Sequence, residues 1–166
     1  TAQLALGDAL AIATMQKKKF GKMDFKKLHP AGSLGAQLKT VEDIMVTGSL
    51  IPFVNENIEV SRALKILSEK KLGILVVINK NKKTLGIITD GQIRRYTQKD
   101  LNFHSLTVKE IMTKNPISVD KNELAAKALS IMNTKKITSL LVVNKNKPQR
   151  TIGVIHVHTI LQSNIS

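Results

Sequence analysis

Histidine is the residue type in this 166-residue chain best suited to acid–base or metal chemistry, and four are present. An imidazole titrates near neutral pH, so it can donate or accept a proton. His29 and His104 stand alone, and by themselves they favour a packing, capping or linker role. His156 and His158 are two apart, so on a strand both would face one side, as a metal pair does. No third ligand recurs at a suitable spacing, and we predict no metal site.

A second group of candidate residues follows a glycine and two apolar residues, at Gly86–Thr89 and again at Gly153–His156. Thr89 ends an apolar stretch and precedes a helix-like segment, so it is expected at a strand-to-helix junction. A hydroxyl and the free N–H groups of a helix N-terminus together suit a phosphate. Arg94 and Arg95 follow within about two helical turns. They are either fork-shaped anion contacts or exposed helix charges.

Several other chemistries are excluded by what the chain lacks. Cysteine is absent, which excludes disulfides, thiolate zinc sites and cysteine nucleophiles. The sequence shows no Ser/His/Asp triad pattern and no glycine signature of a P-loop or a Rossmann unit. We therefore predict no cofactor.

The net charge of +14 invites a nucleic-acid interpretation, but only four of the 26 basic residues are arginine. Nucleic-acid readers rely on arginine forks and on aromatic side chains that stack on bases. Aromatic residues make up 3% of the chain. We expect a solvated lysine-rich surface, or one that attracts a phosphorylated small molecule, and no nucleic-acid partner.

The compartment is predicted from the apolar runs and the N-terminus. No apolar run approaches the roughly 20 residues of a membrane helix, and no signal-peptide pattern precedes the first helix-like segment. The lack of cysteine fits a reducing compartment. We expect a cytoplasmic chain without a membrane partner, and the missing initiator Met suggests that it is clipped.

An internal repeat organises most of the sequence. Four blocks match in the same order: 41–45 with 108–112, 63–67 with 128–132, 74–80 with 139–145, and 85–88 with 152–155. The first and last pairs share an offset of 67 residues. Matches in one order with small indels indicate a duplication, and two copies favour a closed pseudo-twofold pair over a solenoid.

Each copy predicts the same elements. A short helix with a capping-box pattern comes first, at Thr40–Asp43 and at Thr107–Glu110. A short strand, an amphipathic helix, two apolar strands around a Lys/Asn turn and a final helix follow. The fold class is therefore α/β (α+β), with two β-α-β-β-α units. A half of about 60 residues buries too little apolar surface alone, so the two units should cover each other's sheets.

This order, with Met112-Thr113 before Asn115-Pro116 and the two glycine-led strands, resembles the CBS domain pair, or Bateman module, over residues 40–163. The resemblance implies a regulatory sensor that binds adenosine phosphates or related nucleotides between the copies. It implies no catalysis.

The first forty residues predict an alanine-rich helix at 4–20, apolar almost all round, and a Pro/Gly/Ser-rich loop at 28–35. Together with the segment that begins Val41-Glu42-Asp43, they resemble the junction in KpsF/GutQ-type arabinose-5-phosphate isomerases. In that family a sugar isomerase (SIS) domain precedes a CBS pair, and the enzyme interconverts D-arabinose 5-phosphate and D-ribulose 5-phosphate for Kdo and lipopolysaccharide. The implied boundaries are 1–39 for the last SIS helix and linker, 40–100 for repeat one and 101–166 for repeat two.

The resemblance assigns roles to named residues. His29 matches the histidine of the family's H-P-G-G motif and would be catalytic only within a full SIS domain; Ala31 replaces a usual glycine. Nucleotide-binding copies carry a hydroxyl residue and then an Asp that accepts the ribose hydroxyls. Gln92 stands at that Asp position, which predicts weak adenosine-phosphate binding, and Asp90 is expected to cap the helix. The predicted ligand-binding residues are Thr89, Asp90, Gln92, Arg94, Arg95, His156 and Thr159.

Without a phosphate-cradling loop of its own, the chain is expected not to isomerise sugars alone. The exposed apolar helix predicts a homo-oligomer, dimer or tetramer, held by the CBS pairs and the SIS helix. One ligand site rather than two is expected, for a nucleotide or a sugar nucleotide. The alternative is a stand-alone CBS sensor of such a ligand.

Overall fold

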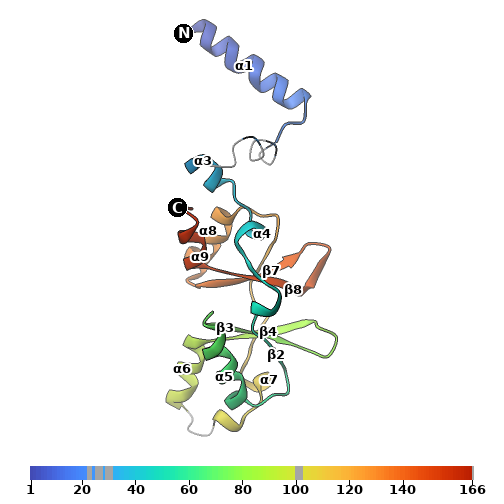
Figure 1. Ribbon diagram of the computed structural model, residues 1–166, viewed down its shortest axis with the longest axis vertical. Helices are drawn as coiled ribbons and strands as arrows, with labels where there is room; N and C mark the ends of the chain where they lie inside the picture. Colours follow the sequence, from blue (N-terminus) through green and yellow to red (C-terminus); the bar gives the residue numbers. More distant parts are fainter. Residues whose placement is uncertain (22–23, 25–27, 29–31, 100–102, 166) are drawn as a thin grey trace.

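The computed structural model describes residues 1–21, 24, 28, 32–99 and 103–165 (Figure 1). His29 and Ala31 therefore lie outside the described residues. The N-terminal part and repeat one form α1 (Ala2–Lys17), α3 (Gly32–Gln37), α4 (Val41–Ile44), β1 (Val46–Thr47), η1 (Gly48–Leu50), β2 (Phe53–Asn55), α5 (Val60–Lys70), β3 (Ile74–Ile78), β4 (Thr84–Thr89) and α6 (Asp90–Lys99). Repeat two forms η2 (Phe103–Ser105), α7 (Val108–Ile111), β5 (Thr113–Lys114), β6 (Ser118–Asp120), α8 (Ala125–Lys135), β7 (Ser139–Asn144), β8 (Lys147–His156) and α9 (Val157–Gln162).

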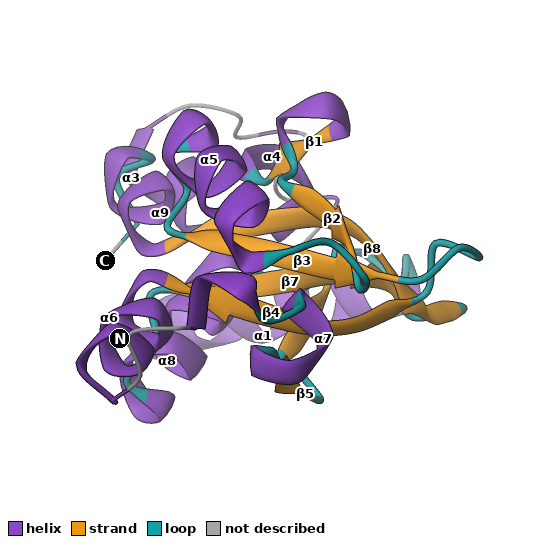
Figure 2. Ribbon diagram, turned by 90° about the horizontal axis from the view of Figure 1, so that it is seen from below, coloured by secondary structure: helices purple, strands orange, loops and turns teal. Residues whose placement is uncertain are grey.

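The predicted repeat of strand, helix, two strands and helix is confirmed, and each repeat supplies three strands of one four-stranded sheet. The strand orders are β2-β3-β4-β5 and β1-β8-β7-β6. The sheets face each other in the middle of the molecule and the helices cover their outer sides (Figure 1). The β3–β4 and β7–β8 hairpins project to the same side, away from most helices (Figure 2).

The fourth strand of each sheet comes from the other repeat. β1 pairs antiparallel with β8, with Val46 opposite Val154, and β5 pairs antiparallel with β4, with Thr113 opposite Ile87. The short helix before each of these strands packs on the same half as the strand. We call α4–β1 (41–47) and α7–β5 (108–114) the opening segments, and each packs on the half built mainly by the other repeat.

Three apolar clusters confirm that the halves cover each other's sheets. Val41 of α4 is buried against α8, β7 and α9, whereas Val108 and Ile111 of α7 are buried against α5, β3 and β4. A third cluster lies between the two sheets and contains Ile51, Ile74, Val76, Leu141 and Val154. Because neither half closes its core alone, the two repeats form one folding unit.

The central helices follow their apolar spacing. In α5 the buried residues are Val60, Ala63 and Leu67, three and four apart, and the C-cap residue Lys71 has a left-handed backbone at φ 54°. In α8 they are Ala125, Ala128 and Met132, and the C-cap residue Lys136 also has φ 54°. The two predicted capping boxes are present at Thr40 and Thr107.

The glycine that leads each motif is required by close approach of an opening segment. A Cβ on Gly86 would lie 2.5 Å from the carbonyl oxygen of Thr113 and 2.9 Å from the Met112 sulfur. A Cβ on Gly153 would collide in the same way with the sulfur of Met45. Met45 and Met112 lie just past the ends of α4 and α7 and cover these glycines.

The N-terminal helix is present as α1, with none of its residues buried. It stands away from the rest of the chain (Figure 1). The loop expected at 28–35 is wrong in part, because α3 occupies Gly32–Gln37. Burial of Ala36 offsets the low helix propensity of the glycines there. Among the described residues, no helix is long and apolar enough to cross a bilayer.

Candidate ligand cleft between the repeats

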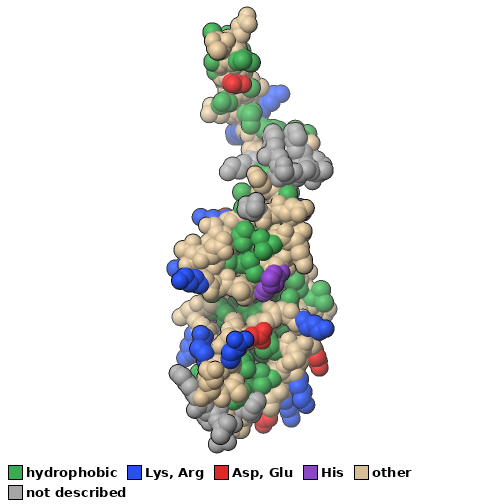
Figure 3. Space-filling model, turned by 90° about the vertical axis from the view of Figure 1, so that its left-hand side faces the viewer, with side chains coloured by type: hydrophobic (Ala, Val, Ile, Leu, Met, Phe, Trp, Pro, Cys, Tyr) green, Lys and Arg blue, Asp and Glu red, His purple; other side chains and the backbone are tan. Residues whose placement is uncertain are grey.

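A cleft of about 670 Å³ opens where the ends of the two sheets meet. Its walls come from both repeats and consist of Gly73, Ile74, Ile87, Thr89, Asp90, Gly91, Arg95, Thr113, Asn115, Pro116, Ile117, Lys136, Ile137, Thr138, Ser139, Leu141 and His156. Figure 3 views a face on which histidine side chains lie between the upper and lower halves, with charged side chains nearby. The volume falls within the range of small-molecule sites.

Thr89 lies at the predicted strand-to-helix junction, as the last residue of β4. Its hydroxyl accepts the backbone N–H of Gln92 at 3.3 Å, so Thr89 caps α6. The expectation that Asp90 caps this helix is wrong, because Asp90 is already the first helical residue. Its backbone N–H bonds the carbonyl of Gly73 at 3.2 Å, and a Cβ on Gly73 would lie 3.0 Å from its carboxylate.

Gln92 is not among the residues that line the cleft and is 7% exposed. Its amide N–H donates to the carbonyl of Ile111, and its amide oxygen accepts the hydroxyl of Thr113 at 3.0 Å. Both partners belong to the opening segment of repeat two. Gln92 therefore ties α6 to that segment and lines a second cavity of about 260 Å³ with Arg95, Tyr96 and Thr113.

The structure brings Thr89, Asp90, Arg95 and His156 together in the cleft wall. Three other predicted ligand residues are not among the lining residues. Gln92 is bonded as described, Arg94 is exposed on α6, and the backbone of Thr159 in α9 accepts the Ser163 hydroxyl at 2.9 Å. The ligand-binding role of all seven stays a prediction.

His156 ends β8 and His158 lies in α9, so the two histidines do not face one side of a strand. The Nδ1 atom of His156 accepts the backbone N–H of His158 at 3.2 Å and caps the helix. The two rings stack with centroids 5.0 Å apart. Burial, and then the charge of His158, lowers the pKa of His156. Among the described residues no three His, Asp or Glu side chains form a group that could hold a metal ion.

Apart from His156, the sequence did not predict the polar residues that repeat two contributes to the cleft, namely Thr113, Asn115, Lys136, Thr138 and Ser139. Asn115 and Lys136 both have left-handed backbones, with φ 53° and 54°. The repeat offset was the available signal, since it aligns the residues that follow each opening segment as equivalent positions. No local sequence pattern shows that residues 113–117 reach the cleft beside Thr89, because the exchange of opening segments brings them there.

The cleft combines two cations, one carboxylate and several hydroxyl and amide groups over an apolar floor. Arg95 and Lys136 supply the positive charges and Asp90 the negative one. Ile74, Ile87 and Leu141 supply the apolar surface. Such a cleft can hold a small molecule that has an anionic group and an apolar or planar part.

The fold and this cleft define a tandem pair of CBS domains. The CBS domain family matches residues 41–99 and 108–165, more than half of the chain, and the chain belongs to that family. The crystal structure of CBSX2 in complex with AMP aligns with a TM-score of 0.66 at 23% identity, over 75% of this chain and 94% of that one. The CBS pair of protein MJ0100 in complex with 5′-methylthioadenosine and S-adenosyl-L-methionine aligns with a TM-score of 0.64 at 25% identity, over 75% and 94%.

Curated relatives extend the similarity across the N-terminal helix. The arabinose 5-phosphate isomerase KdsD of Francisella tularensis is 39% identical over 163 residues, 98% of this chain and 49% of the relative. The KdsD of Escherichia coli strain K12 is 36% identical over 166 residues, 99% and 50%. An uncharacterized protein of Rickettsia prowazekii is 37% identical over 163 residues, 98% and 50%. The chain thus spans about half the length of these relatives.

Proposed function

We propose that this chain is the C-terminal regulatory and oligomerisation part of an arabinose-5-phosphate isomerase. The longer protein would interconvert D-arabinose 5-phosphate and D-ribulose 5-phosphate on the way to Kdo and lipopolysaccharide. Residues 1–39 would be the last SIS helix and linker, 40–100 CBS repeat one and 101–166 CBS repeat two. Identities of 36–39% to KdsD enzymes over nearly the whole chain support this assignment.

The exposed helix α1 supports the presence of a further domain. Its large apolar side chains lie all round it and are 42–74% exposed: Leu4, Leu6, Leu10, Ile12 and Met15. A helix that is apolar all round is normally buried on several sides. Within a SIS domain it would gain that burial, and His29 on the following linker would reach the isomerase site.

The observation that carries the regulatory role is the cleft between the repeats, with Arg95 and Lys136 in its wall. The ligand would be a nucleotide or a sugar nucleotide, with its phosphate toward these cations. The AMP and S-adenosyl-L-methionine complexes of the two CBS structures above support a nucleotide-like ligand. Gln92 carries no carboxylate at the family's ribose position, and its amide is already bonded to Ile111 and Thr113, which favours weak adenosine-phosphate binding.

Titration calorimetry of the chain with AMP, ATP, S-adenosyl-L-methionine and UDP-glucose tests the ligand role. Arg95→Ala should weaken binding of any phosphorylated probe about ten-fold or more, because it removes a charged contact. Arg62→Ala, which is exposed on α5 and is not among the residues lining the cleft, is the matched control and should leave affinity unchanged. Equal losses in both variants, or no binding of any probe, would count against a ligand-sensing cleft.

The isomerase assignment has a separate test. A coupled assay should detect no conversion of arabinose 5-phosphate by this chain alone, because it carries no phosphate-cradling loop. A fusion to the SIS half of the F. tularensis relative should restore turnover. Conversion by the isolated chain, or a fusion that stays inactive although the SIS half is folded, would contradict the assignment.

A further inference from the structure

The two opening segments dock in equivalent ways. The backbone N–H of Glu42 in α4 donates to the carbonyl of Lys121 at 2.9 Å, and that of Lys109 in α7 donates to the carbonyl of Glu56 at 2.9 Å. Glu42 and Lys109 are related by the repeat offset of 67 residues. Glu56 and Lys121 follow the equivalent strands β2 and β6 at an offset of 65, and we call these two positions the receiving positions.

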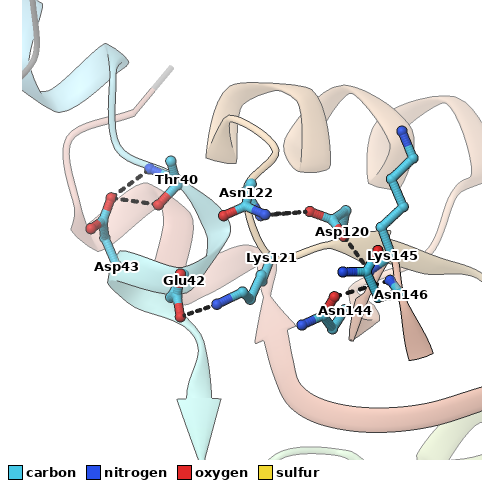
Figure 4. Close-up of polar contacts among 9 residues, drawn as sticks. All are labelled: Thr40, Glu42, Asp43, Asp120, Lys121, Asn122, Asn144, Lys145 and Asn146. Atoms are coloured by element: carbon cyan, nitrogen blue, oxygen red, sulfur yellow. Dashed lines mark hydrogen bonds and ion pairs between the residues drawn. The ribbon is translucent and has the colours of Figure 1, made fainter. Parts of the chain in front are cut away.

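Each docking is also held by one ion pair, and the two pairs have opposite polarity. On the half built mainly by repeat two, Glu42 of α4 forms an ion pair with Lys121 at 2.8 Å, as Figure 4 shows. On the half built mainly by repeat one, Lys109 of α7 forms an ion pair with Glu56 at 3.4 Å. The acidic and basic partners have therefore exchanged places between equivalent positions.

Most other features of the two dockings are the same. Both opening helices begin with a threonine capping box, both bury a valine, and both end in a methionine that covers a glycine. By these features either opening segment would fit either half. The sign of the charge distinguishes them.

The reversed polarity penalises the wrong docking. If an opening segment docked on the receiving position of its own repeat, in the same chain or in a second copy, Glu42 would face Glu56 or Lys109 would face Lys121. Like charges at that distance repel, and arranging charges against a competing partner is a known source of specificity.

We infer that the two reversed ion pairs direct each opening segment to the other repeat and away from its own. Both ion pairs are partly exposed to solvent, and such pairs contribute little to stability, so their main effect is on the choice between dockings. With the two ion pairs reversed, each repeat is complementary in charge to the other repeat and not to a copy of itself.

Two double charge reversals separate this role from simple stabilisation. In Glu42→Lys/Lys121→Glu, and in Glu56→Lys/Lys109→Glu, both native ion pairs remain attractive, but both opening segments now carry the same sign. Wrong docking is then attractive as well. The quadruple variant that combines them reverses every sign and restores the discrimination, so it controls for damage by the substitutions themselves.

Each variant is unfolded in urea, refolded at high protein concentration and treated with a zero-length carbodiimide, which joins adjacent lysine and carboxylate side chains. We expect 42–56 and 109–121 links in the double variants besides the native 42–121 and 56–109 links. Recovery of wild-type-sized protein should fall roughly three-fold, as expected for the loss of a surface-charge preference, and return to the wild-type level in the quadruple variant. Native links alone in the double variants, or a quadruple variant that recovers no better than they do, would overturn the inference.

Discussion

The hydroxyl oxygens of Thr84 and Thr151 lie 2.8 Å apart, and the two residues are separated by 67 positions, the offset of the repeat. They are therefore the same residue of each copy, meeting across the pseudo-twofold relation between the sheets. The hydroxyl of Thr84 also accepts the backbone N–H of Thr151 at 3.1 Å. Thr89 and His156, again 67 apart, both line the cleft at the opposite end of the same strands.

Replacing Thr84 by Val should lower the free energy of unfolding by about 1–3 kcal/mol, because the buried N–H of Thr151 loses its acceptor. Urea denaturation measures the change. Thr84→Ser keeps the hydroxyl and should lose much less. A larger loss for Ser than for Val would show that the methyl group, and not the hydrogen bond, matters at this position.

The two motif glycines should not tolerate a methyl group. Gly86→Ala and Gly153→Ala are each expected to destabilise the fold by about 1–3 kcal/mol through overpacking against the opening segments. Gly91→Ala is the control, since a Cβ there meets no atom within 4 Å. It should instead stabilise α6, by about 0.5–1 kcal/mol. Thermal or urea unfolding of the three variants distinguishes a general glycine effect from close approach.

Gln92 is expected to be a structural tie. Gln92→Leu should cost about 1–3 kcal/mol, because the buried carbonyl of Ile111 loses its donor. Thr113→Val removes only the bond to the amide oxygen and should cost less, since Thr113 is exposed. The loss of unfolding free energy in each variant is measured from the shift of the urea midpoint, at an unchanged slope of the free energy against urea concentration. A neutral Gln92→Leu would mean that α6 and the opening segment are held by packing alone.

His156 should make stability depend on pH. Its folded pKa lies below the ordinary value of 6.5, so the unfolded chain binds the proton more readily. The stabilisation from neutral His156 is complete above the unfolded pKa and is lost as pH falls from there through the folded pKa. His156→Asn keeps a cap acceptor without titrating. Between pH 7.5 and pH 5 the free energy of unfolding should fall more in the wild type than in His156→Asn. An equal fall in the two proteins would contradict this.

Helix α1 should drive self-association of the chain. Light scattering at high concentration is expected to give at least a dimer, and removal of residues 1–19 should improve solubility and leave the CBS pair folded by circular dichroism. A wild-type monomer with α1 intact, or a truncated chain that is less soluble, would contradict the prediction that α1 drives self-association.

The repeated blocks predicted the architecture because residue spacing within each copy determines its own helices and strands. The exchange of opening segments could not be predicted, since Val41 and Val108 look alike locally and only the tertiary contacts choose their halves. In the cleft, Thr89 was found because its junction is local. The direction of Gln92 depends on a carbonyl 19 residues away, and the contribution of Lys136 on the approach of the second repeat.

The pairing of β1 with β8 also orders events during synthesis of the chain. Val46 is among the first residues of the module to leave the ribosome, and its partner Val154 is among the last. The α4–β1 segment therefore stays undocked while more than a hundred residues are added. Any domain upstream of it has that whole interval to fold, as domains commonly do during translation, before the module closes behind it.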